Sequence, residues 1–238
     1  MTLTALSFRS MLRGRRLIGV MMLPLVVAAV AIGLLVTAGV KDRTGAYEVL
    51  VGNLLLPLVV ALVSLVLGVN AFGDERDEGT LGLLMATTLA RPRIVLAKYL
   101  AAVTVVWLAC LPATLACMAL GTATRLEMGT IWWSLLVSSG LAAAAYVALF
   151  TLLSLLLNRA VLLGLAYLVL WEGLLAGTAP AFRNLSVGAY ANRIAGAPWV
   201  NAPFAMADTS VVIAVVTLMA VAGLAIGAAA VRLPRTHV

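Results

Sequence analysis

Few side chains in this sequence could perform acid–base or nucleophilic chemistry, and the most conspicuous is a single carboxylate. Glu172 is the one acidic residue inside a long apolar stretch. A carboxylate in hydrocarbon is costly, which makes it a functional-site hypothesis by default. Arg159 begins the same stretch, about 20 Å away along a helix axis, and so is too distant to be its intrahelical partner. Two roles stay open for Glu172: hydrogen bonding that holds outer helices in place, or contact with substrate or protons.

The remaining candidate residues argue against catalysis by this chain. Cys110 and Cys117 share one apolar helix, where their Cα atoms would lie about 10 Å apart, too far for a disulfide. Core packing is their expected role, and soft metal ligation is the alternative. The single histidine, His237, leaves neither a metal centre nor a Ser–His site. Neither Lys41 nor Lys98 lies in the Gly-Lys-Ser/Thr pattern that cradles phosphates. The sequence therefore predicts a chain that is not an enzyme, binds no metal or cofactor and hydrolyses no ATP itself.

The composition identifies the environment of these residues. Of 238 residues, 64% are hydrophobic and only 11% are charged. A soluble domain of this length could not bury so much apolar surface, so lipid must solvate most of the chain. The formal net charge of +7 needs only an anionic membrane surface as its partner, and nucleic-acid binding is not expected.

Six stretches approach the length of about 20 apolar residues that a spanning helix requires. They cover residues 17–40, 49–73, 99–124, 130–157, 160–178 and 209–231. With no internal repeat or linker, residues 1–238 are expected to form one all-α transmembrane domain. A five-span alternative would omit 160–178, the stretch that contains Glu172.

Six spans place both termini on one side, and the distribution of basic residues selects that side. Most of the 16 Lys and Arg residues then share the side of the termini: Arg9, Arg13, Arg15, Arg16, Arg76, Arg91, Arg93, Lys98, Arg159, Arg232 and Arg235. The other side holds Lys41, Arg43, Arg125, Arg183 and Arg193. The positive-inside rule therefore predicts cytoplasmic termini and a multi-pass protein of the inner (plasma) membrane. A five-span chain would place Arg232 and Arg235 outside, against this bias.

Two segments beside the spans have an interfacial character. Residues 1–16 place Arg9, Arg13 and Arg16 on one helical face, which predicts an interfacial helix, with a basic tail that only sets topology as the alternative. Residues 179–208 mix proline, glycine and aromatic residues with only three charges. This mixture predicts short outer helices in a re-entrant segment that dips into the outer interface.

The cytoplasmic segment 74–98 concentrates much of the charge of the chain. An acidic cluster precedes a run in which Leu81, Leu84, Met85, Thr88 and Leu89 recur at the spacing of one helix face. Basic residues and Pro92 follow, in the order that the helix dipole and a helix stop favour. The pattern predicts an amphipathic helix over 74–93 that offers an apolar stripe to a partner. The alternative is a solvated loop with topology-setting arginines.

The same segment resembles the membrane subunits of ABC-2 type transporters. The resemblance is carried by Glu75-Arg76-Asp77-Glu78-Gly79-Thr80-Leu81, Leu83-Leu84, Leu89, Arg91, Ile94 and Lys98. It implies that 74–93 is the coupling helix gripped by an ATP-binding subunit, with the contact residues Glu75, Arg76, Asp77, Glu78, Gly79, Thr80, Leu81, Leu84, Met85 and Arg91. Gly82, Thr88 and Ala97 depart from the family pattern, and Gly82 should weaken the helix by about 1 kcal/mol relative to alanine.

The resemblance implies an export permease that pairs with itself or with a sister permease. Two copies of a separate ATP-binding subunit would hold ATP and Mg²⁺, and substrate would pass along the seam between the permease chains. Haem, lipid or polyketide, and peptide exporters share this plan, so the cargo stays open. Two rival functions are an ATP-independent transporter or channel that uses Glu172, and a membrane scaffold or immunity protein.

Overall fold

The computed structural model describes residues 15–37, 39–77, 91–123, 128–157, 159–176, 180–196 and 209–232. Of these residues 93% are helical, and none lies in a strand. The helices are α2 (Arg15–Thr37), α3 (Val40–Glu48), the π-helix η1 (Val49–Val60), α4 (Ala61–Asp77), α6 (Arg91–Thr122), α7 (Met128–Leu156), α8 (Ala160–Ala166), the π-helix η2 (Tyr167–Leu175), α10 (Pro180–Arg183), α11 (Val187–Ile194) and α12 (Val211–Arg232). The predicted all-α architecture is confirmed.

Five helices in the described part of the chain are long and apolar enough to cross a membrane. They are Gly19–Thr37, Arg43–Ala71, Arg93–Thr122, Trp132–Leu156 and Val211–Arg232, and each lies at a predicted span. The remaining predicted span, 160–178, corresponds to a shorter apolar helix, Ala160–Leu175. At 1.5 Å per residue that helix would cover roughly 24 Å, less than the ~30 Å of a hydrocarbon core. The fold is therefore that of a membrane protein with several spanning helices.

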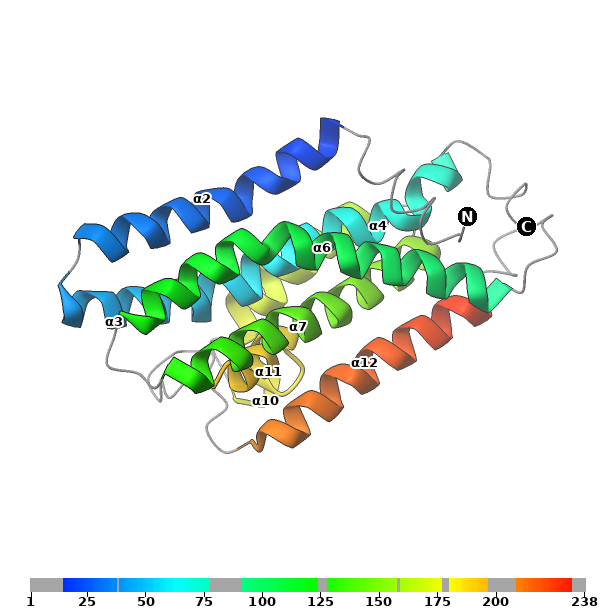
Figure 1. Ribbon diagram of the computed structural model, residues 1–238. Helices are drawn as coiled ribbons and strands as arrows, with labels where there is room; N and C mark the ends of the chain where they lie inside the picture. Colours follow the sequence, from blue (N-terminus) through cyan, green and yellow to red (C-terminus); the bar gives the residue numbers. More distant parts are fainter. Residues whose placement is uncertain are drawn as a thin grey trace.

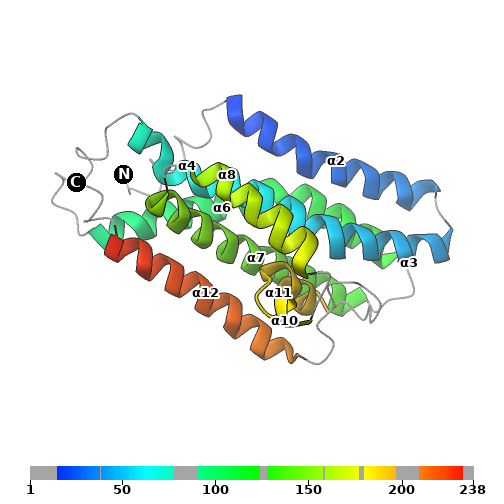
Figure 2. The same cartoon turned by 180° about the vertical axis from the view of Figure 1, so that it is seen from behind.

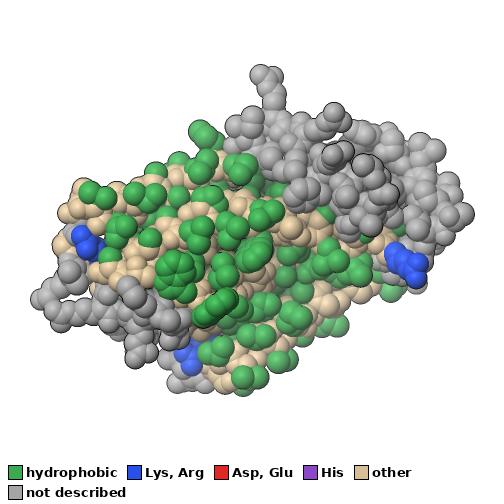
Figure 3. Space-filling model, viewed as in Figure 1, with side chains coloured by type: hydrophobic (Ala, Val, Ile, Leu, Met, Phe, Trp, Pro, Cys, Tyr) green, Lys and Arg blue, Asp and Glu red, His purple; other side chains and the backbone are tan. Residues whose placement is uncertain are grey.

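The long helices lie side by side, with α6 and α7 between α2 and α12, which lie on opposite flanks (Figures 1 and 2). Helix α2 packs against α6, and α12 packs against α7. Apolar side chains cover the middle of the surface, while the visible basic side chains lie towards its ends (Figure 3). This distribution matches a lipid belt between two polar boundaries.

The helix ends around residues 74–98 differ from the sequence prediction. Helix α4 continues to Asp77, beyond the predicted span end at residue 73, and α6 begins at Arg91. Pro92, expected to stop the coupling helix, instead lies in the first turn of α6, where its missing N–H costs nothing. Residues 78–90 of the predicted coupling helix and residues 1–14 of the predicted interfacial helix lie outside the described residues. The second long helix also begins before the predicted span start at residue 49, because α3 continues directly into η1.

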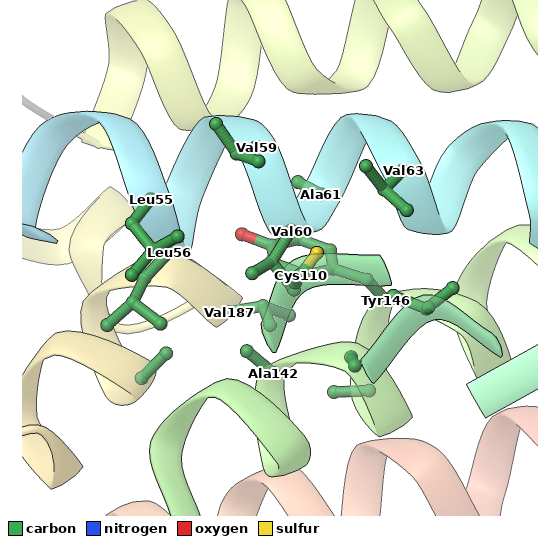
Figure 4. Packing of buried hydrophobic residues seen from close by; sticks show 14 of the residues in the cluster. Leu55, Leu56, Val59, Val60, Ala61, Val63, Cys110, Ala142, Tyr146 and Val187 are labelled. Carbon is green, nitrogen blue, oxygen red and sulfur yellow. The ribbon is translucent and has the colours of Figure 1, made fainter. Parts of the chain in front are cut away.

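The core is built where small residues let backbones approach. Residues from η1, α4, α6, α7 and α11 meet in one apolar cluster that includes Leu56, Cys110 and Tyr146 (Figure 4). A Cβ on Gly68 of α4 would lie only 3.2 Å from the Val147 carbonyl oxygen of α7. Such close approach matters because helices in lipid gain no hydrophobic drive to associate and depend on van der Waals packing.

Candidate functional site

Glu172 lies in η2 and is only 2% exposed, yet its carboxylate is fully engaged by hydrogen-bond donors. Oε1 accepts from the Tyr167 hydroxyl at 3.2 Å, from the Val187 amide at 3.0 Å and from the Gly188 amide at 3.4 Å. Oε2 accepts from the Ser186 hydroxyl at 2.5 Å. Oε1 therefore accepts from three donors and Oε2 from one.

The backbone donors belong to the first turn of α11. The first N–H groups of a helix have no intrahelical acceptor, and these must be satisfied by other groups. Ser186 is the N-cap of α11, and its hydroxyl oxygen accepts from the Ala189 amide at 3.0 Å while it donates to Glu172. Glu172 therefore completes the cap from another helix, and its charge is favoured by the positive end of the α11 dipole.

Local backbone geometry brings the first donor to this carboxylate. Tyr167 and Glu172 are five residues apart within η2. A π-helix closes i→i+5 bonds, so residues at this spacing lie one turn apart. The buried Tyr146 hydroxyl of α7 also interacts electrostatically with Glu172. Within the described residues, this tyrosine hydroxyl has no partner at hydrogen-bond geometry. Two tyrosines and a serine thus surround one carboxylate.

The rest of α11 is fastened to two other helices. The Ser138 and Ser134 hydroxyls of α7 donate to the Ala191 and Ala195 carbonyls, at 2.5 and 2.9 Å. The Asn192 side-chain amide donates to the Gly52 carbonyl of η1 at 2.8 Å, and Asn192 is 3% exposed. These bonds satisfy polar groups of a short helix that packs against α7, α12 and η1 (Figure 1). The prediction of short helices between residues 179 and 208 agrees with α10 and α11.

The geometry favours an anchoring role for Glu172 over contact with substrate or protons. Both oxygens of this buried carboxylate accept from groups of the protein itself. A cationic substrate would have to displace donors that the first turn of α11 needs. Burial of the charge is offset by these donors, as a buried carboxylate requires.

The structure places the other predicted residues apart from this site. Cys110 and Cys117 are free and buried in the core, and the described residues contain no group of three or more potential metal ligands. Among the predicted ATPase-coupling residues, Glu75, Arg76 and Asp77 lie in the last turns of α4, and Arg91 starts α6. The others, Glu78, Gly79, Thr80, Leu81, Leu84 and Met85, lie outside the described residues.

Sequence reasoning missed the partners of Glu172. Ser186 was the one with a usable signal, because serine is a preferred N-cap residue. Asn192 lies within the segment predicted to form short outer helices, where no partner was assigned to it, and Ser138 lies within an apolar span where serine is common. Lys98 was assigned a role in topology and in the motif but no partner, yet its ammonium is buried and donates to the Ala71 carbonyl of α4 at 2.8 Å.

The fold and the site together define a helical membrane protein in which a buried carboxylate caps a short internal helix. Comparison with known proteins identifies no matching family model and no similar curated protein.

We predict that Glu172 tolerates glutamine but not leucine. In Glu172→Gln the amide oxygen can keep the Oε1 contacts, and its NH₂ can donate to Ser186 if the serine hydroxyl turns. Glu172→Leu leaves the α11 amides without an acceptor, at a cost of about 1–3 kcal/mol for each unsatisfied group. The apparent melting temperature in detergent, measured by size-exclusion after heating, should fall by several degrees only for leucine.

Glu48→Leu is the matched control, because Glu48 ends α3 and is only partly buried. It should leave the melting temperature nearly unchanged. Equal stability of Glu172→Leu and the unmodified protein would contradict the anchoring role. Equal damage from glutamine and leucine would show that charge, rather than hydrogen-bond acceptance, is what α11 requires.

Proposed function

We propose that this chain is the permease subunit of an ATP-driven ABC exporter. Its main support is the resemblance of residues 75–98 to the coupling region of ABC-2 permeases. The helices that flank this region agree with such a role, because α4 ends at Asp77 and α6 begins at Arg91 at the same end of the bundle (Figure 1). A subunit bound at that end could act on both helices at once.

The proposed orientation follows from the charges at the two ends. The start of α6, the end of α7 and the end of α12 lie together and carry Arg93, Arg159 and Arg232 (Figures 1 and 2). The positive-inside rule makes this end cytoplasmic, with both termini on that side. Helix Ala160–Leu175 returns from this end to the end where α11 lies, so we propose it as a sixth crossing completed by the α10–α11 segment.

The tightly packed interior of a single chain supports the pairing of two permease chains. The bundle interior around α6 and α7 is occupied by side chains such as Leu55, Met118 and Phe150, which are almost fully buried. A pathway for substrate therefore fits better along a seam between two copies than through one. The assembly would contain two permeases and two ATP-binding subunits, which hold ATP and Mg²⁺.

A long continuous helix gives this assembly a way to transmit movement from the ATP-binding subunits across the membrane. Helix α6 has 32 residues and would reach about 48 Å, longer than a hydrocarbon core. Movement of the ATP-binding subunits at Arg91 would therefore be carried along α6 towards its far end at Thr122, past Pro112 inside the helix. The ATP-independent alternative receives less support, because the carboxylate it would use is occupied by the cap of α11.

We predict that Leu84→Asp or Leu81→Asp abolishes association with the ATP-binding subunit. Either change places an unpaired charge in the proposed interface, which typically costs several kcal/mol. The native operon should be expressed with a tagged permease, and purification in mild detergent should test whether a P-loop ATPase that hydrolyses ATP co-purifies. Leu83→Asp is the matched control, since its side chain would face away from the stripe of the predicted helix.

The unmodified permease should retain the ATPase, and Leu83→Asp should retain most of it. Purification of the unmodified permease without any ATPase would contradict the proposed function. Normal association of Leu84→Asp and Leu81→Asp would remove these leucines from the interface.

We also predict that single cysteines at positions 78 and 159 label from the cytoplasm and a cysteine at 185 labels from outside. Cys110 and Cys117 would be replaced by alanine in this background. Position 185 is a suitable reporter because Leu185 is 66% exposed. In intact cells an impermeant maleimide should reach only position 185, and permeabilisation should expose the other two. Labelling of 159 and 185 from the same side would show that Ala160–Leu175 does not cross the membrane.

A further inference from the structure

The second long helix carries a proline within its π-helical part. Pro57 lies in η1, between the outer arm formed by α3 and the start of η1 and the inner arm α4. Proline has no N–H, and in a π-helix the bond it cannot make is to the carbonyl five residues earlier. That carbonyl belongs to Gly52. The sequence of the helix therefore creates one carbonyl that lacks its regular intrahelical donor.

Asn192 of α11 supplies the donor that Pro57 removes. Its side-chain amide donates to the Gly52 oxygen at 2.8 Å across 140 residues of sequence, and Gly52 and Asn192 are both buried. A buried carbonyl in a membrane protein needs such a partner, because no lipid can provide it. The Asn192 amide therefore replaces the hydrogen-bond donor that the helix lacks at Pro57.

Helix α11 also touches the proline directly. A Cβ on Gly188 would lie 2.8 Å from Pro57 Cβ and 3.0 Å from Glu172 Oε2. Gly188 therefore sits between the proline and the carboxylate that caps α11, in a gap that admits no side chain. The same short helix thus lies against Pro57 and donates to the Gly52 carbonyl. It is also hydrogen-bonded to η2 and α7.

We propose that Pro57 is a hinge in the second membrane helix and that Asn192 is the positioning residue that locks it. Proline is among the few identifiable causes of sharp bends in helices. While the Asn192 bond is formed, α11 holds the outer arm in place, and when that bond opens the outer arm is free to move about Pro57. As part of the proposed exporter, the hinge would let the inner arm, which ends at Asp77 beside the coupling region, move independently of the outer arm.

A double-mutant cycle tests whether Asn192 serves the proline. Asn192→Leu keeps the approximate volume but removes the donor, and it should lower the apparent melting temperature. Pro57→Ala restores an N–H that can donate to Gly52 within the helix, so in that background Asn192→Leu should cost less than half as much. Contacting residues couple in this way, whereas independent sites add. Pro112→Ala is the matched control, because Pro112 lies inside α6, and it should leave the cost of Asn192→Leu unchanged.

A distance measurement tests the movement itself. Spin labels at positions 49 and 133 report on the outer arm and on α7, and both native side chains are exposed, Val49 at 52% and Trp133 at 73%. Electron-spin distance measurements on the purified full chain, with Cys110 and Cys117 replaced by alanine, should give one narrow distribution. Asn192→Leu should broaden or shift it, and addition of Pro57→Ala should narrow it again.

An unchanged distribution in Asn192→Leu would overturn the lock, and an equal cost of Asn192→Leu in the presence and absence of Pro57 would overturn its link to the proline. Both measurements use the chain without an ATP-binding subunit. They therefore succeed or fail independently of the co-purification experiment that tests the exporter.

Discussion

The hydrogen bonds between the Glu172 carboxylate and the first turn of α11 are the interaction on which the placement of this short helix in the bundle depends. A short helix buried among apolar helices exposes N–H groups that lipid cannot satisfy. A buried carboxylate is equally costly by itself. Placed together, each removes the penalty of the other, because the carboxylate accepts from Val187 and Gly188 and the helix dipole favours its charge. Removing either partner leaves the other uncompensated.

Both irregular helices of the structure converge on α11. The π-helix η2 presents Glu172 to its N-terminus, and the π-helix η1 presents the Gly52 carbonyl to Asn192. In a π-helix the backbone hydrogen bonds join residues five apart instead of four, and such helices often occur at functional positions. Here their irregularities are matched by the polar groups of a third element. The regular helices α6 and α7 form the frame, and α7 holds the carboxyl end of α11 through Ser134, whose hydroxyl donates to the Ala195 carbonyl.

The sequence predicts the long helices well because bilayer thickness fixes their length. Five of the predicted spans contain helices that meet this length, while Ala160–Leu175 falls short. Glu172 could be identified because a lone carboxylate in an apolar stretch is costly unless specific groups of the protein stabilise it. The position of α11 could not be predicted, since eight residues are too few for helicity by propensity and the helix depends on partners distant in sequence. Pro92 was misassigned because proline occurs both after the end of a helix and in the first turn of one. The sequence does not distinguish these two positions, and the structure places Pro92 in the first turn of α6.

The most direct test of the central claim is amide hydrogen exchange at the first turn of α11. If Glu172 caps this helix, the Val187 and Gly188 amides of the purified protein should exchange slowly. In Glu172→Leu they should exchange orders of magnitude faster, while the amides of residues 142–148 in α7 keep their protection. Equal protection of Val187 and Gly188 in the two proteins would show that α11 does not depend on the carboxylate and would contradict the account.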